Sequence, residues 1–310
     1  MKLLLANPRG FCAGVKRAIE GVEKALALFG PPIYVKHEIV HNKHVVDALK
    51  AKGAIFIEDL NLVPIGSRLI YSAHGVSPAV RHEAKKRSLH EIDATCGLVT
   101  KVHSAAKRYA ARGYKIILIG HKDHVEIIGT KGEAPDSTYV VESEEDVLAL
   151  SFSLKEKLFY LTQTTLSLQD VEKIATALKK KYPHIETLPS SSICYATTNR
   201  QLALKAFAKR AELIFVVGDP TSSNSNRLKE VALGEGTPSF LINDETEIAP
   251  NLTTKIQVVG LTAGASTPEN IVQNCIKKLQ SLGVTEIEDI FYTEENVVFS
   301  LPKALTQLSV

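Results

Sequence analysis

The chain has 310 residues, of which 45% are hydrophobic, and its formal net charge is +3. This length and composition exclude an intrinsically disordered protein and allow two or three small α/β units with their own cores. A nucleic-acid-binding role is disfavoured, because Trp is absent and the basic clusters at 81–87 and 179–181 fit solvated helix faces. The apolar run at 3–6 is too short for a signal peptide or a membrane span, which predicts a cytoplasmic protein with no membrane partner.

Strand and helix patterns alternate along the whole chain. Short apolar runs predict strands at 3–6, 33–36, 54–57, 69–72, 115–119, 157–161, 213–217, 238–242 and 256–260. Amphipathic spacing predicts long helices at 13–29, 97–112, 195–210 and 269–282, the last of them opened by a capping box at 266–269. Such alternation is typical of α/β folds with parallel sheets and right-handed crossovers.

Three cysteines occupy the same place in a repeated plan: Cys12, Cys96 and Cys194 each stand directly before a predicted helix. A polar loop follows the next strand, 29, 28 and 28 residues after the cysteine, at His41, His124 and Ser222. A second strand-end loop in each copy carries His74, Thr164 and Ser266.

The repetition predicts three small α/β units with mainly parallel sheets around a pseudo-threefold axis, with a metal cluster at the centre. The expected limits are 13–95, 96–193 and 194–282, with 1–12 joining the third sheet and 283–310 forming a C-terminal extension.

The four cysteines favour metal binding or catalysis over disulfides, because cytoplasmic thiols stay reduced. Zinc sites usually use closely spaced ligand pairs, whereas no two cysteines of this chain lie within 80 residues of each other. An iron-sulfur cluster accepts wide spacing, and three thiolate ligands leave one iron open for substrate. The fourth cysteine, Cys275, falls on the apolar face of a predicted helix, so we interpret it as a buried small hydrophobe.

The polar strand-end residues favour a phosphate or diphosphate ligand. They are His41, His74, His124, Ser222, Ser223, Asn224 and Ser266. No Walker or Gly-x-Gly-x-x-Gly pattern accompanies them, so a nucleotide is not expected. Each also has a structural interpretation: a lone histidine is often structural, the serines could simply cap helices, and Thr164 and Thr165 could satisfy local backbone groups.

Glu126 is the only carboxylate close to these positions, two residues after His124. Buried beside a metal-bound substrate it could deliver protons, and the alternative is a surface glutamate at a helix N-terminus.

Several strings of the chain resemble the 4-hydroxy-3-methylbut-2-enyl diphosphate reductase family, which acts last in the methylerythritol phosphate route to isoprenoids. These strings are ANPRGFCAG at 6–14, HN at 41–42, SAHG at 72–75, DATC at 93–96, QTT at 163–165, ICYATTNR at 193–200, SSNSNR at 222–227 and TAGAS at 262–266. The resemblance runs from the N-terminus to about Leu282.

The resemblance implies a 4Fe-4S cluster held by Cys12, Cys96 and Cys194 with one open iron site. It implies that the seven polar residues above bind the diphosphate, and that Glu126 and Thr164 deliver protons near the substrate hydroxyl. The implied reaction is a two-electron, two-proton reductive dehydroxylation that yields isopentenyl and dimethylallyl diphosphate. Since no flavin or nicotinamide motif is present, an external donor such as ferredoxin, flavodoxin or a reductase system is expected.

Three positions depart from the family pattern: Gly97 stands where proline is common, and Val125 and Ile128 interrupt a segment that usually reads HPEVEGT. Two other functions compete with the reductase. One is an iron-sulfur hydro-lyase acting on a phosphorylated substrate, which would consume no electrons, and the other is a metal-binding regulator.

Overall fold

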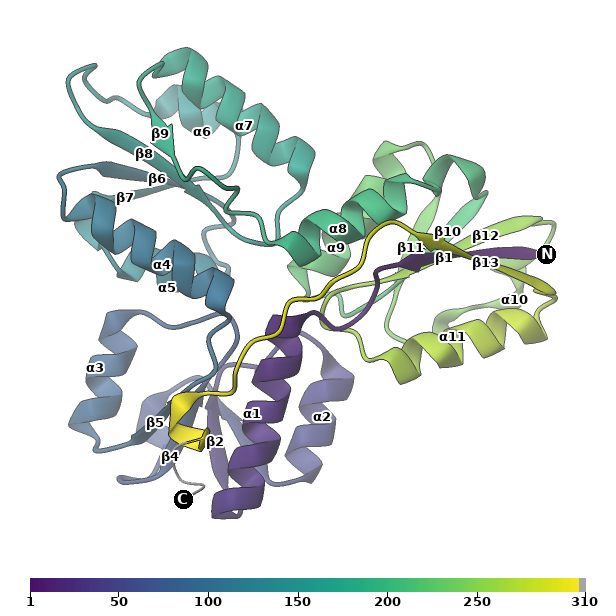
Figure 1. Ribbon diagram of the computed structural model, residues 1–310, viewed down its shortest axis with the longest axis horizontal. Helices are drawn as coiled ribbons and strands as arrows, with labels where there is room; N and C mark the ends of the chain where they lie inside the picture. The colour runs from purple at the N-terminus through teal and green to yellow at the C-terminus, as the bar shows by residue number, and fades with distance from the viewer. Residues whose placement is uncertain (307–310) are drawn as a thin grey trace. The chain divides into compact units, whose positions relative to one another are not determined.

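The computed structural model describes residues 1–306, which form two compact bodies (Figure 1). Body 1 comprises Met1–Val15, His41–Val46 and Tyr195–Val298, and body 2 comprises Lys16–Val40, Asp47–Cys194 and the described residues from 299 onward. Body 1 contains one sheet, sheet A, and body 2 contains two, sheets B and C. Every strand pair in the three sheets is parallel, which confirms the predicted α/β class.

Sheet A has five strands in the order β11-β10-β12-β1-β13. Their bounds are β1 (Lys2–Asn7), β10 (Leu213–Val217), β11 (Ser239–Ile242), β12 (Val258–Ala263) and β13 (Glu286–Phe291). The helices of body 1 are α8 (Tyr195–Lys205), α9 (Ser223–Gly234), α10 (Pro250–Thr253) and α11 (Glu269–Ser281).

Each face of sheet A is buried under an apolar layer. Side chains of α11, among them Ile271 and Cys275, pack on one face against Phe215 and Leu261. Side chains of α8 and α9, such as Leu204 and Leu228, pack on the other. Cys275 is 0% exposed, which confirms its interpretation as a core residue.

The N-terminal strand β1 lies in the interior of this sheet, between β12 and β13. Strand β13 was not predicted, because three of its six residues are acidic and four are exposed, so they give no apolar run. Its attachment is partly electrostatic: the Lys2 ammonium lies 2.6 Å from a Glu286 carboxylate oxygen and 2.8 Å from one of Glu288. The C-terminal strand β13 therefore pairs with the N-terminal strand β1.

Sheets B and C of body 2 each have four strands, in the orders β3-β2-β4-β5 and β7-β6-β8-β9. Sheet B contains β2 (Ile33–Lys36), β3 (Ala54–Ile57), β4 (Arg68–Tyr71) and β5 (His90–Asp93), and sheet C contains β6 (Lys115–Ile119), β7 (Thr138–Val141), β8 (Leu158–Thr162) and β9 (Glu186–Thr187). The helices are α1 (Ala13–Phe29), α2 (Lys43–Ala51), α3 (Pro78–Lys86), α4 (Gly97–Ala110), α5 (Val125–Gly132), α6 (Glu144–Ala149), α7 (Leu168–Lys181) and α12 (Lys303–Thr306). The first residues of α1 and α2 belong to body 1.

Most sequence-predicted elements are present, several with the bounds expected, including α1, β2, β6 and β10. The predicted strand at 256–260 is wrong at both ends, since β12 runs from Val258 to Ala263 and keeps pairing with β10 as far as Val217. The predicted helix 195–210 ends at Lys205, and a separate 3-10 turn covers Ala208–Arg210. The domain limits and the pseudo-threefold axis stay predictions.

Among the described residues there is no helix that combines the length and the apolar character needed to span a bilayer.

Truncation of a core aromatic should show that sheet A carries the stability of body 1. We expect Phe215→Ala, at a side chain that is 0% exposed, to lower the free energy of unfolding by about 3–5 kcal/mol, since it leaves a cavity. The matched control is Phe291→Ala on β13, where the ring is 66% exposed and the cost should stay below about 1 kcal/mol. Denaturant unfolding measures the loss of free energy in both variants. Equal losses would contradict the conclusion that the buried core of sheet A carries the stability of body 1.

Candidate functional site

The three repeated cysteines make the same backbone hydrogen bond. The Cys12 N–H donates to the Ala265 carbonyl (3.1 Å), the Cys96 N–H to Ala73 (2.9 Å) and the Cys194 N–H to Thr164 (3.0 Å). The acceptors lie in the loops after β12, β4 and β8, one in each sheet. Each cysteine also directly precedes a helix, α1, α4 or α8. The sequence repeat is therefore a repeat of structure, in which each cysteine joins a helix start to the carboxyl end of a parallel strand.

The environments of the thiols separate these three cysteines from the fourth. None of the four described cysteines forms a disulfide, and Cys12, Cys96 and Cys194 are partly exposed. Burial raises the pKa of the Cys275 thiol to about 12, with acidic neighbours such as Glu245 adding to the rise. Because thiolates are the form that binds metal, the repeated cysteines fit a thiolate-bound group and Cys275 does not.

In body 1, the loop after β12 joins several predicted site residues. The Ala265 N–H donates to Asn224 Oδ1 (2.8 Å), and its carbonyl accepts the Cys12 bond. Asn224 also donates from Nδ2 to the Thr197 hydroxyl (3.3 Å) and is 4% exposed. The amide of Asn224 is thus held in one orientation next to the loop that carries Cys12.

Ser222 is the N-cap of α9, accepting from the Ser225 N–H (3.3 Å) and the Ser225 hydroxyl (3.1 Å). The capping interpretation of Ser222 is confirmed, since α9 begins at Ser223. Gly264 must be glycine for reasons of space, because a Cβ there would collide with the Ser225 side chain. The close approach keeps the serine-rich start of α9 against the loop after β12.

The predicted capping box at Ser266 is wrong. Helix α11 begins at Glu269 with Pro268 as its N-cap, and no side chain caps it. Ser266 instead donates its hydroxyl proton to the His41 carbonyl (2.9 Å). Residues 41–46 belong to body 1, so this bond brings two predicted diphosphate ligands together within one body.

In body 2, His124 is the N-cap of α5, and its Nδ1 accepts from the Glu126 N–H (3.2 Å). An accepting Nδ1 in a neutral imidazole leaves the proton on Nε2. His124 therefore presents an N–H donor at its other ring nitrogen, which suits an anionic ligand.

Glu126 is a buried carboxyl held by one partner residue. It is 2% exposed and accepts from the Thr164 N–H at Oε1 (2.7 Å) and from the Thr164 hydroxyl at Oε2 (2.9 Å). Burial raises its pKa from 4.5 to about 7, although both hydrogen bonds from Thr164 favour the ionised form and oppose the rise. The interpretation of Glu126 as a surface glutamate is wrong, and so is local backbone satisfaction for Thr164.

Thr164 connects this carboxyl to a cysteine, since its carbonyl is the acceptor of the Cys194 N–H. The hydroxyl of Thr165 accepts from the side-chain Nε2 of Gln163 (2.9 Å), which is not one of the backbone groups proposed for it. The loop after β8 thus has the same role in sheet C that the loop after β12 has in sheet A.

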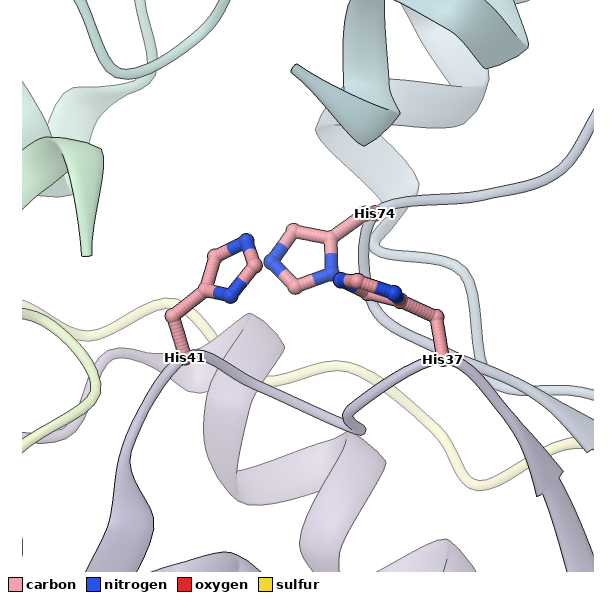
Figure 2. Close-up of side chains that lie close together, drawn as sticks. All are labelled: His37, His41 and His74. Atoms are coloured by element: carbon pink, nitrogen blue, oxygen red, sulfur yellow. The ribbon is translucent and has the colours of Figure 1, made fainter. Parts of the chain in front are cut away.

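Three histidines of body 2 form a row, and one of them, His37, was not predicted as a site residue. The ring of His74 lies 6.0 Å from that of His124 and 5.9 Å from that of His37, measured between centroids. Figure 2 shows His37 and His74 side by side. His37 has a left-handed backbone (φ 62°), and its Nδ1 lies 2.6 Å from Glu58 Oε1. The available signal was a second histidine in the loop after β2, four residues before His41.

The structure shows what surrounds the three residues that depart from the family pattern. The Cα of Gly97 faces Phe299, whose ring would lie 3.1 Å from a Cβ at that position. Glycine therefore makes room for an aromatic ring of the C-terminal segment. Val125 and Ile128 line a cavity of about 160 Å³ together with His37 and Ser72, and Ile128 is 54% exposed.

The two bodies carry different chemistry. The loops of body 1 offer hydroxyls and an amide with fixed partners, and body 2 offers imidazole donors and a carboxyl that holds a proton near neutral pH. The first set suits oxygen-rich anions, and the second can bind an anion and supply a proton.

Comparisons with known proteins show close relatives. The chain is 70% identical over 305 residues to the 4-hydroxy-3-methylbut-2-enyl diphosphate reductase of Protochlamydia amoebophila, covering 98% of this chain and 97% of that protein. It is 63% identical over 306 residues to the protein of the same name from Chlamydia pneumoniae, covering 98% of each.

Two solved structures of reductases with similar names also match this chain. The E-1-hydroxy-2-methyl-but-2-enyl-4-diphosphate reductase from Plasmodium falciparum matches with a TM-score of 0.97 and 49% identity, over 99% of this chain and 97% of that one. A second structure, of (E)-4-hydroxy-3-methyl-but-2-enyl diphosphate reductase, matches with a TM-score of 0.65 and 29% identity, over 90% of this chain and 99% of that one. A family model described as LytB protein matches residues 3–280, and the chain belongs to this family.

Proposed function

We propose that the protein is a 4Fe-4S-dependent 4-hydroxy-3-methylbut-2-enyl diphosphate reductase that forms isopentenyl and dimethylallyl diphosphate. The names of relatives that are 63–70% identical support the substrate and the reaction. The observation in the structure that carries the proposal is the repeated bond from each of three cysteines to a strand-end loop. The similarities do not favour a hydro-lyase, since the relatives are named reductases.

Cys12, Cys96 and Cys194 would hold the cluster. Each of these cysteines is partly exposed and forms no disulfide, and each stands at a helix start, where the helix dipole favours a negative thiolate. The cluster, when bound, supplies two electrons in sequence and a Lewis-acidic iron without a protein ligand.

The diphosphate would be bound by His41, His74, His124, Ser222, Ser223, Asn224 and Ser266. Most of these side chains are fixed by the contacts described above, so little conformational entropy is lost when they bind an anion. A capping serine accepts with its oxygen and can still donate its proton.

Glu126 would donate the proton that lets the substrate hydroxyl leave as water, with Thr164 contacting the same hydroxyl. A carboxyl with a pKa near 7 is half protonated at neutral pH and can release a proton readily. The two bonds from Thr164 stabilise the carboxylate that remains after transfer.

The electrons would come from an external donor, a ferredoxin, a flavodoxin or a reductase system. A cytoplasmic location also belongs to this proposal, and neither a nucleic-acid nor a membrane partner is part of it.

Anaerobically purified protein with reduced viologen should consume dye only when the diphosphate substrate is present, two electrons per product molecule. A hydro-lyase would convert substrate without consuming dye, so product formed with no dye oxidation would refute the reductase assignment.

The same assay tests the proton donor. Glu126→Gln should keep the cluster and lower kcat by about 10²–10⁴-fold, the usual contribution of a general acid. Glu172→Gln, an exposed site on α7, is the matched control and should behave like the parent protein. Turnover within a factor of a few of the parent would exclude Glu126 as the proton source.

Replacement of single cysteines should distinguish the ligands from the core residue. Cys12→Ser, Cys96→Ser and Cys194→Ser should lose or degrade the cluster, because a serine hydroxyl is a poor substitute for a thiolate. Cys275→Ser should leave iron content and the visible spectrum unchanged. Iron and sulfide analysis of the four variants measures how much cluster each one keeps. A similar loss of cluster in all four would overturn the ligand assignment.

The raised pKa of Glu126 predicts a pH dependence of stability. The folded carboxyl keeps its proton up to about pH 7, whereas the unfolded one releases it near pH 4.5. The free energy of unfolding should therefore fall as the pH rises through this window, by up to about 3 kcal/mol, and stay level above it. Glu126→Gln removes this contribution. The free energy of unfolding of the variant minus that of the parent should therefore rise from pH 4.5 to 7. Denaturant unfolding of iron-free protein measures it; a difference that is constant with pH would contradict the prediction.

A further inference from the structure

A fully buried arginine makes two hydrogen bonds to the backbone of the loop that carries Cys12. Arg200, on α8, donates from Nε (3.1 Å) and Nη2 (2.6 Å) to the carbonyl of Gly10, two residues before Cys12. Its side chain is 1% exposed. A carbonyl that accepts two charge-assisted bonds is fixed far more firmly than one that accepts a single neutral bond.

The position of Arg200 depends on Glu295, which lies in the segment after β13. Nη1 and Nη2 contact both carboxylate oxygens of Glu295 at 3.0–3.3 Å, and Nη1 also donates to the Ala196 carbonyl (2.9 Å). Asn199 donates to Glu295 Oε1 (3.0 Å) and holds the carboxylate from the other side. All five N–H groups of the guanidinium thus have acceptors.

The loop has other contacts as well: the Gly10 N–H donates to the Ala263 carbonyl (3.3 Å), and the Arg9 side chain donates to the Ala6 carbonyl (3.1 Å) and to Glu269 (2.8 Å). Gly10 has a left-handed backbone (φ 65°), and a Cβ there would meet the Thr267 carbonyl at 3.1 Å. A cavity of about 490 Å³ on this flank is lined by Pro8, Arg9 and Glu295. Arg200 supplies two hydrogen bonds to the Gly10 carbonyl and so fixes the peptide group that follows Gly10.

We propose that Arg200 and Glu295 are positioning residues for Cys12, through which the C-terminal segment fixes this cysteine for metal binding. The role in metal binding rests on the proposed function, whereas the effect on the loop does not. Without the carboxylate, Arg200 becomes an uncompensated buried charge and is expected to move towards water, which releases the Gly10 carbonyl.

Hydrogen exchange of iron-free protein separates this role from general stabilisation. In Glu295→Gln, the amides of 9–13 should exchange about tenfold faster, because the freed loop holds the Gly10 and Cys12 N–H groups less firmly against the Ala263 and Ala265 carbonyls. The segment around Cys96, with its equivalent backbone bond, is the internal reference and should not change. Glu294→Gln, the same substitution at the exposed neighbouring residue, is the matched control and should match the parent.

A second variant keeps the test decisive if Glu295→Gln folds poorly. Arg200→Lys preserves the charge but cannot bind Gly10 and Glu295 together, so it should show the same local acceleration. In both variants the reconstituted cluster should lose iron to a chelator about tenfold faster than in Glu294→Gln.

Unchanged exchange at 9–13, or equal acceleration at 9–13 and around Cys96, would overturn the proposal. A parent protein that takes up no cluster would refute the proposed function instead, and the exchange measurement would still decide the positioning role.

Discussion

The arrangement of functional residues depends on one hydrogen bond that is made three times, from a cysteine N–H to a carbonyl just beyond a parallel strand. In parallel sheets, the carboxyl ends of neighbouring strands lie at one edge, and loops there are free to carry polar groups. The bond fixes each helix start against such a loop. Thr164 and Ala265 also bind Glu126 and Asn224, so the same loops orient the groups proposed to contact substrate.

The chemistry of Glu126 follows from the balance between burial and hydrogen bonding. Burial penalises the charged carboxylate, and the two bonds from Thr164 favour it. Two donors, one of them a backbone N–H, do not cancel the cost of complete burial, so the proton is retained near neutrality. A more exposed carboxyl with these same partners would be ionised and could not act as an acid, which explains why its position at the first turn of α5 matters.

The sequence was sufficient to predict the fold class, the repeat of the cysteines and the core position of Cys275, because these depend on local periodicity and chain spacing. It was insufficient for β5, β7, β9 and β13, which are short or polar and are stabilised by pairing with distant strands. Ser266 shows a different limit. Its sequence fits a capping box, but Pro268 takes the cap position and the serine hydroxyl bonds the His41 carbonyl, 225 residues away. For His37 the sequence shows only a second histidine near His41, and its ring contact with His74 is tertiary. Arg200 is marked by its contacts with Gly10 and Glu295, which are distant in the chain.

Cys12 depends on residues that are synthesised much later than the cysteine itself. Strand β1 pairs with β13, and Glu295 reaches Arg200 95 positions earlier in the chain. Contacts of such sequence separation carry a loop-closure cost and form only when most of body 1 is present. The loop of Cys12 therefore acquires its final geometry after sheet A has closed, so a partly folded chain lacks one of its three proposed cluster ligands. If the cluster is inserted only when all three ligands are in place, completion of the C-terminal segment becomes a requirement for metal binding as well as for folding.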